Sequence, residues 1–178
     1  MIIIGIDPGK TGAIVAINTT LGTVEKHLIP LIGNELDLAS LKQILCKYIS
    51  APVCVYIEDV HAIFGSAAGA TFTFGFVCGA IQAAVACLGL PYTLVQPKAW
   101  QKELYQGIPE IRKQPIKIKK GKRTGKMIQG KMDTKAMSLL AAKRLFPKLD
   151  LRATERCKKP HDGIVDALLI ATYGCREI

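Results

Sequence analysis

The sequence predicts an α/β fold with a mixed five-stranded sheet flanked by helices on both faces. Five short apolar or β-branched segments, each bounded by turn residues, predict the strands. Longer segments with apolar residues at helical spacing predict helices between and after them. The first three strands follow one another directly, which favours antiparallel pairing, and the later alternation of strand and helix favours parallel addition. A length of 178 residues predicts one domain, residues 1–178.

The N-terminal part contains four of the predicted strands and one helix. Residues 1–7 (MIIIGID) and 12–20 (GAIVAINTT) are apolar segments joined by a PGKTG turn, and 23–31 form a more polar third strand. In residues 35–49, apolar side chains recur at the spacing of an amphipathic helix, at Leu38, Leu41, Leu45 and Ile49. Residues 51–60 (APVCVYIEDV) are rich in β-branched residues and predict the fourth strand.

The C-terminal part is mostly helical. Residues 61–70, rich in glycine and alanine, predict a flexible loop, and 71–90 predict a long apolar helix with Gly89 near its C-terminal cap. Gly75 and Gly79 share a face of that helix, where another helix or backbone could approach. Residues 91–97 predict the fifth strand and 98–105 a short helix. Asp133 caps a helix over 133–146, and residues 160–174 predict a last helix, apolar nearly all round and therefore buried.

The composition is that of a well-packed globular protein, because 49% of the residues are hydrophobic. Glycine, threonine or charge interrupts every apolar stretch before about 18 residues, so no membrane span is expected. The apolar start lacks a basic region and a cleavage site, and it is interpreted as a strand rather than a signal peptide. The six cysteines form no C-x-x-C pair, which predicts buried reduced thiols and a cytoplasmic or comparable reducing compartment.

Most of the formal net charge of +10 lies in one segment. From Arg112 to Lys135 there are ten Lys or Arg residues and one acid, Asp133, whereas the remaining chain has 14 basic and 13 acidic residues. We expect residues 111–132 to be a flexible basic insertion that binds nucleic acid, since each neutralised phosphate releases counterions. A solvated loop without a partner and a nuclear-targeting signal are the alternatives. The predicted backbone contacts are Lys117, Lys119, Lys120, Lys122, Arg123 and Lys126.

Four acids could meet in the folded chain. Asp7 ends the first strand and Glu58 ends the fourth, so both reach one sheet edge if these strands are neighbours. Asp162 and Asp166, four residues apart, project from one face of the last helix. Burying acids in so apolar a helix is costly unless a cation or hydrogen-bond donors compensate them. Carboxylate oxygens suit Mg²⁺, and two such ions about 3.5–4 Å apart stabilise the attacking and leaving oxygens of a phosphodiester.

Each acid also has a purely structural interpretation. Asp162 could cap its helix, and Asp7 could bond only the amides of its own turn. Either Glu58 or its neighbour Asp59 could be a solvated strand end, because spacing alone does not determine which one points inward. The joint occurrence of these acids with a strongly basic segment favours a metal-dependent nuclease.

Further candidates lie around these acids. Lys98, Lys102 and Lys135 flank the basic segment from structured regions and could contact phosphate, although most lysines are surface groups. His61 and Phe64 follow Glu58, where an aromatic ring could stack on an unpaired base or simply plug the core.

Two family resemblances accompany these motifs. The DPGKTG turn resembles the first phosphate loop of actin-like ATPases and sugar kinases, but those enzymes need two lobes, and 178 residues supply only one. Five segments in order over nearly the whole chain resemble RuvC-type Holliday junction resolvases of the RNase H-like (retroviral-integrase-like) superfamily. They are IGIDPGKTGAIVAI, VYIEDVHAI, FGFVCGAIQAAVACLGLPYTLVQPKAWQK, DTKAMSLLAAKRLFP and HDGIVDALLIATYG, and the third and fifth are most like phage and other virus-type members.

The RuvC resemblance implies a homodimer that grips a four-way DNA junction and makes paired symmetric nicks. It implies two Mg²⁺ (or Mn²⁺) ions held by Asp7, Glu58, Asp162 and Asp166, with Lys102 and Lys135 near the substrate. The chain departs from the cellular pattern in three ways. Its last two acids are four rather than three apart, His61 replaces a stacking phenylalanine, and the lysine-rich stretch is longer. A related nuclease on other branched DNA or RNA–DNA hybrids, and a non-catalytic DNA-binding protein, are the alternatives.

Overall fold

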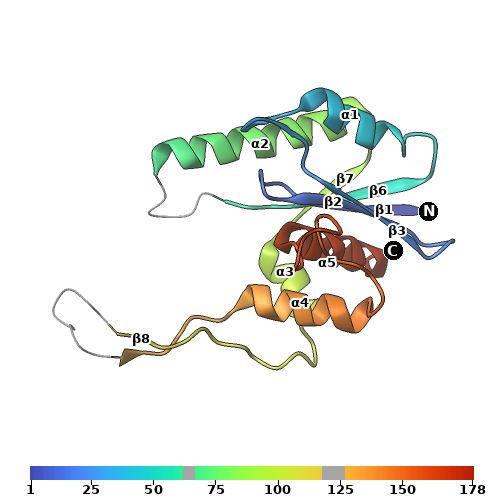
Figure 1. Cartoon of the computed structure of the whole chain (residues 1–178). Coiled ribbons are helices and arrows are strands. Elements are labelled where there is room, and N and C mark those ends of the chain that lie inside the picture. The colour runs from blue at the N-terminus through green and yellow to red at the C-terminus, as the bar shows by residue number, and fades with distance from the viewer. Residues whose placement is uncertain (62–66, 118–126) are drawn as a thin grey trace.

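A five-stranded sheet forms the centre of the molecule, in a computed structural model that describes residues 1–61, 67–117 and 127–178. Its strands are β1 (Ile2–Asp7), β2 (Ala13–Asn18), β3 (Thr23–Leu28), β6 (Val53–Glu58) and β7 (Tyr92–Val95), in the spatial order β3-β2-β1-β6-β7. β2 pairs antiparallel with both β1 and β3, whereas β6 pairs parallel with both β1 and β7 (Figure 1). The predicted mixed five-stranded sheet is therefore confirmed.

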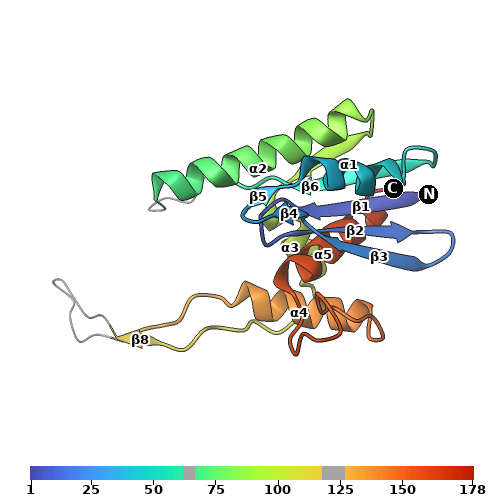
Figure 2. The same ribbon diagram turned by 45° about the horizontal axis from the view of Figure 1, so that its top comes forward.

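Helices cover both faces of this sheet. α1 (Leu38–Cys46) and α2 (Ala68–Cys87) lie on one face, and α3 (Pro97–Leu104), α4 (Thr134–Leu145) and α5 (Asp162–Arg176) lie on the other (Figures 1 and 2). Between β3 and α1 the chain makes a small hairpin of β4 (Leu31–Ile32) and β5 (Glu35–Leu36). A second hairpin, β8 (Ile116–Lys117) with β9 (Met127–Ile128), belongs to a long arm that extends away from α4 (Figure 1).

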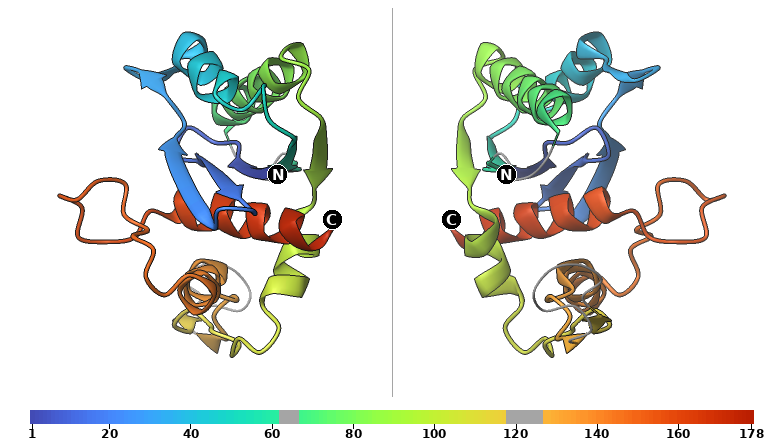
Figure 3. Two further views of the ribbon diagram at one scale, coloured as in Figure 1. Left: turned by 90° about the vertical axis from the view of Figure 1, so that its right-hand side faces the viewer. Right: turned by 90° about the vertical axis from the view of Figure 1, so that its left-hand side faces the viewer.

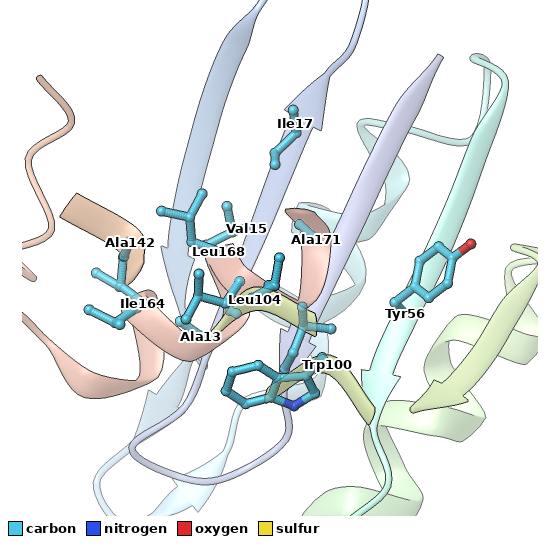
Figure 4. Packing of buried hydrophobic residues seen from close by; sticks show 14 of the residues in the cluster. Ala13, Val15, Ile17, Tyr56, Trp100, Leu104, Ala142, Ile164, Leu168 and Ala171 are labelled. Atoms are coloured by element: carbon cyan, nitrogen blue, oxygen red, sulfur yellow. The ribbon is translucent and has the colours of Figure 1, made fainter. Parts of the chain in front are cut away.

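Alternation along the strands divides the core into two clusters. Ile4, Ile6 and Ile14 point to the face covered by α1 and α2, where they pack on Leu41, Leu45 and Ile81. Val15 and Ile17 point to the other face and pack with Leu168 of α5 and with Trp100 and Leu104 of α3 (Figure 4). Because β1 and β2 are buried on both faces, their sequences are continuous apolar runs rather than alternating ones.

Several local expectations need correction. The helix predicted over 35–49 is shorter, because α1 begins at Leu38 and ends at Cys46, so Ile49 lies outside it. In α1 Leu41 and Leu45 are buried, whereas Leu38 is 52% exposed. The six cysteines are free, but five are half-buried and Cys87 is exposed. The predicted loop over 61–70 is shorter than expected, since α2 already begins at Ala68. Residues 62–66 lie outside the described part of the chain.

Helix α2 also differs from expectation. Its glycines and threonines do not interrupt it, and it runs for 20 residues with Val77, Ile81 and Val85 as its buried residues. By length and composition it is the one helix in the described ranges that could cross a membrane, and 22% of its most apolar stretch is buried. A single such helix is weak evidence for a membrane span. Within the described residues, a Cβ atom at Gly75 or Gly79 would meet nothing within 4 Å, so the expected close approach to these glycines is not seen there.

Candidate functional site

The sheet brings Asp7 and Glu58 to the same edge. β1 and β6 are parallel neighbours in which Ile6 pairs with Ile57, so the acids that end the two strands emerge side by side. Parallel strands present their carboxyl ends together, which is where α/β proteins commonly place a binding site. The predicted juxtaposition of these two acids is what the sheet order produces.

Helix α5 brings the other two acids because glycines allow it to contact β1 closely. A Cβ atom at Gly5 would overlap the backbone of Ala167 and Ala171, so the helix and strand touch through their main chains. At the start of α5, a Cβ at Gly163 would lie 2.5 Å from the carbonyl O of Thr11. These contacts place the N-terminal turns of α5 beside the turn that follows Asp7.

A hollow of about 460 Å³ results at this edge of the sheet. It is lined by Asp7, Thr11, Lys135, Pro160, His161, Asp162, Gly163 and Asp166. Glu58 does not line the hollow, but its charge raises the pKa of Asp7, and the charge of Asp166 raises the pKa of Glu58. Four elements, β1, β6, α4 and α5, therefore contribute charged side chains to one small region.

Burial makes the negative charge of this region costly. It is the main reason that the pKa of Asp7 is raised to about 7, with further increases from the charges of Glu58 and Asp166. Burial likewise raises the pKa of Glu58 to about 7 and that of Asp166 to about 6. Such values for carboxyl groups indicate a site that a positive charge would stabilise.

Hydrogen-bond donors orient two of these carboxylates. The indole Nε1 of Trp100, a fully buried residue of α3, donates to Glu58 Oε1 at 3.0 Å. Ser138 of α4 hydrogen-bonds Asp166 and thereby lowers its pKa, and its hydroxyl lies 2.8 Å from that of Tyr105. Sequence reasoning did not identify these three residues. One feature of the sequence could have indicated them: Trp, Tyr and Ser occur beside apolar residues of the predicted helices, and their polar atoms need hydrogen-bond partners when they are buried.

Lys135 supplies the positive charge. Its Nζ lies 2.6 Å from Asp162 Oδ2, and both side chains are more than half exposed. The cap of α5 is His161, whose Nδ1 accepts from the amide of Ile164 at 3.4 Å, so Asp162 does not serve as the cap. Asp162 instead stands in the first turn of α5, at the mouth of the hollow, with Lys135 as its partner.

The structure also settles two alternatives for the strand ends. Glu58 points inward to Trp100, whereas Asp59 lies 3.7 Å from His61, whose side chain is 79% exposed. The turn after Asp7 is closed by backbone hydrogen bonds, from Gly9 to the Asp7 carbonyl and from Gly12 to that of Gly9. In the described residues no hydrogen bond joins the Asp7 carboxylate to these amides.

The donor set suits a divalent cation. Among the residues that the structure describes, no group of three or more Asp, Glu, His or Cys side chains is arranged so that it could already hold a metal ion. Mg²⁺ at phosphate-transfer sites, however, commonly uses one or two carboxylates and completes its shell with water and substrate phosphates. Asp7 and Asp166, two half-buried carboxylates lining one hollow, meet that requirement.

The remaining predicted contacts lie away from the hollow. Lys98 and Lys102 are exposed on α3 and do not line it. In the basic segment, Lys113 N donates to Lys131 O at 2.9 Å and Arg112 pairs with Met132, so an antiparallel ladder begins the arm that continues to β8 and β9. This ladder was not expected. Lys117 lies in β8, while Phe64, Lys119, Lys120, Lys122, Arg123 and Lys126 lie outside the described residues.

Comparison with known proteins identifies the fold. No protein-family model and no curated protein matches the sequence. Among solved structures, T. thermophilus RuvC in complex with a Holliday junction substrate aligns with a TM-score of 0.59 and 15% identity, over 99% of this chain and 96% of that chain. A second Thermus thermophilus RuvC structure aligns with a TM-score of 0.48 and 18% identity, over 99% and 97%. The first likeness establishes a RuvC-like fold for the whole chain.

Proposed function

We propose that this RuvC-like chain is a divalent-metal-dependent endonuclease that makes paired nicks in four-way DNA junctions. The observation that supports it most is the convergence of Asp7, Glu58 and Asp166, three acids with raised pKa values, beside a hollow that also contains Lys135. A similar fold has been solved with a Holliday junction, which favours this substrate over other nucleic acids. The narrower assignment to phage- or virus-type members comes from the sequence segments alone.

Asp7, Glu58, Asp162 and Asp166 would hold the cations, with Mg²⁺ preferred because all the ligand atoms are carboxylate oxygens. Bound ions would supply the positive charge that stabilises the attacking and leaving oxygens of a phosphodiester. Trp100 and Ser138 hold two of the carboxylates in place for that role. Such outer contacts orient metal ligands and set their basicity.

The protein's own cations would position the DNA. Lys135 lies at the mouth of the hollow, where its ammonium can leave Asp162 and bind a phosphate oxygen once a cation takes up the acids. Lys113 and Lys131 are exposed at the base of the arm, close to α4, which presents Lys135. The arm at 111–132 would thus follow the sugar–phosphate backbone away from the cut site.

A homodimer is part of the proposal, because two symmetric nicks require two active sites. The exposed apolar face of α2 is the surface we assign to it, defined by Phe72, Gly75, Phe76 and Gly79. Phe72 is 78% and Phe76 59% exposed, and among the described residues a Cβ at either glycine would meet no atom within 4 Å, so a second helix could approach closely. Apolar exposure on this scale is typical of a protein interface.

The test is cleavage of a four-way junction with and without Mg²⁺, with a linear duplex and an RNA–DNA hybrid as competitors. We expect Mg²⁺-dependent paired nicks in the junction, and we expect Asp7→Asn to abolish cleavage while retaining binding. Asp59→Asn, which changes an acid next to Glu58 that points away from it, is the matched control and should cleave normally. Unchanged cleavage by Asp7→Asn would remove Asp7 from the site, and binding without any metal-dependent cleavage would favour a non-catalytic DNA-binding protein.

A further inference from the structure

A second basic surface lies on the last turn of α4 and on the connection from α4 to α5. Residues 143–159 contain seven Lys or Arg residues and two acids, a net charge of +5, although the chain outside 112–135 is nearly neutral. The remaining residues therefore have 7 basic and 11 acidic side chains. We call the exposed cations of this segment the connection surface, and they are Lys143, Arg144, Lys148, Arg156, Lys158 and Lys159.

Hydrogen bonds hold the connection in a defined shape. Lys26 of β3 donates its ammonium to the carbonyls of Asp150 (2.5 Å) and Arg152 (2.8 Å), which ties the segment to the edge of the sheet. Leu151 is buried in the core, and its carbonyl accepts from the amide of His161 at 2.8 Å. A segment anchored at both ends presents its cations in fixed positions, so little ordering is needed when a ligand binds.

One of the two acids in the segment is already neutralised. The guanidinium of Arg152 makes two contacts with Asp150, at 2.9 and 3.0 Å, and holds the pKa of that carboxyl at about 2. In the part of the chain that the structure describes, no ion pair engages Lys143, Lys148, Lys158 or Lys159. Their charge is available to an outside partner.

The connection surface adjoins the active-site hollow. A separate hollow of about 550 Å³ is lined by Lys143, Asp150, Arg152, Lys158 and Pro160, among others, and Pro160 also lines the hollow that contains Asp7 and Asp166. Figure 3 shows the connection projecting to the side of the molecule beyond β3, a direction different from that of the arm carrying β8. A DNA strand with one phosphate beside Asp7 and Asp166 would therefore meet basic groups of the connection surface as well as those of the arm.

We propose that the connection surface binds the phosphate backbone of the DNA arm next to the cut strand, in addition to the arm at 111–132. This inference rests on the proposed function, because it takes DNA as the ligand of the adjoining hollow. Exposed lysines on an anchored segment suit a regular array of phosphates rather than a single anion, since the charges are spread along the surface. The two basic regions would then hold two different arms of a junction.

The test compares Lys158→Gln/Lys159→Gln with the matched control Lys42→Gln/Lys47→Gln, which removes equal charge from α1 and its C-cap on the opposite face of the sheet. Binding is measured without divalent metal on junctions with arms of about 8 and about 20 base pairs, roughly 27 and 68 Å long. We expect the Lys158/Lys159 variant to bind long-armed junctions about tenfold more weakly at low salt. The slope of log K against log salt should fall by about 2, and short arms should show a smaller loss.

Equal affinity and equal salt slope for both variants on long arms would overturn the inference. Cleavage assays keep the two proposals apart. If the wild-type protein cleaves junctions but the lysine pair has no arm-dependent effect, the inference is wrong and the proposed function stands. If the arm-dependent loss is found and no DNA is cleaved under any metal condition, the connection surface binds DNA and the nuclease proposal is wrong.

Discussion

Trp100 links the hydrophobic core to the acids. Its ring packs among the core residues on α3 and α5, while its one polar atom donates to Glu58. That hydrogen bond lowers the pKa of Glu58, which burial raises to about 7. A buried carboxylate that loses its donor keeps the full cost of its desolvation.

The first prediction concerns Trp100→Phe, which removes the donor and keeps an aromatic ring. We expect junction cleavage to fall about 10–100-fold, the usual effect of losing an outer contact to a metal ligand. The pKa of Glu58 should rise, so the acidic limb of the pH–rate profile moves to higher pH, which a purely structural change would not cause. The control is Tyr56→Phe, since Tyr56 is a buried aromatic residue that packs on Tyr173 rather than on the acids. An unshifted profile would show that Trp100 does not position Glu58.

The second prediction concerns Asp7 and pH. The pKa of Asp7 in the folded protein is about 7, above its ordinary value of 3.8, so the folded state binds the proton more tightly than the unfolded state. The contribution to stability is therefore fully present below about pH 4 and is lost as the pH rises to about 7. Without metal, the Asp7 charge should destabilise the protein at pH 8 by about 1–3 kcal/mol.

Asp7→Asn should accordingly raise the melting temperature of the metal-free protein at about pH 8, by roughly 2–4 °C per kcal/mol, and have little effect near pH 4. Mg²⁺ should stabilise the wild-type protein at pH 8 more than the variant, because the ion offsets the same charge. Thermal melts of both proteins at the two pH values, with and without Mg²⁺, test this. A difference in melting temperature that is equal at both pH values would contradict it.

At the scale of elements, the contact between α5 and the turn after β1 decides the geometry of the site. Gly163 stands where the helix meets Thr11 and Gly12, and a Cβ there would lie 2.5 Å from the Thr11 carbonyl and 2.7 Å from Gly12 Cα. Both partners are backbone atoms, which cannot rotate away as a side chain can. The first turn of α5 must therefore shift if Gly163 gains a side chain.

The third prediction is that Gly163→Ala moves Asp162 and Asp166 away from Asp7. We expect a loss of about 1–3 kcal/mol in the free energy of unfolding and a larger loss of cleavage than of DNA binding. The control is Gly69→Ala in α2, where a Cβ meets no atom within 4 Å and alanine favours the helix. Chemical denaturation and single-turnover cleavage measure the two effects. Wild-type cleavage by Gly163→Ala would mean that this contact does not position the acids.

At the scale of the whole molecule, the exposed apolar face of α2 is the feature that the single chain leaves unexplained. The opposite side of this helix is in the core through Val77, Ile81 and Val85. Phe72 and Phe76 remain largely exposed on a helix without charged residues. A second copy with the same face would bury both aromatic pairs around a two-fold axis.

The fourth prediction is that Phe72→Glu/Phe76→Glu gives a monomer of 19.3 kDa in light scattering, whereas the wild-type protein is expected to give twice that mass. Like charges placed across a two-fold axis repel, so association should be lost while the fold persists. The variant should also nick junctions without pairing the two cuts. Leu21→Glu/Ile49→Glu changes two other exposed apolar residues and should remain dimeric. A monomeric wild-type protein would exclude the proposed interface.

Local pattern alone predicted the five strands of the central sheet, their antiparallel and parallel pairing and the presence of helices on both faces, but not the two short hairpins. It also singled out Asp7, the acidic pair Glu58 and Asp59, and the two acids of the last helix as candidates, since an acid at the end of an apolar run stands out in a sequence. These features depend on neighbouring residues and on simple periodicity. Local pattern predicted three features less well: the surroundings of the glycines in α2, the burial of the cysteines and the extent of the loop over 61–70. Each depends on what packs against the segment.

Only the tertiary structure decided that Glu58 rather than Asp59 turns inward, that Trp100 and Ser138 hold the acids, and that Pro160 joins two hollows. The approach of α5 to β1 through Gly5 and Gly163 was equally invisible in the sequence. Each of these features joins residues that are far apart along the chain, and packing of the whole core fixes their separation. Periodicity encodes which face a side chain takes, but it does not encode which distant residue that face will meet.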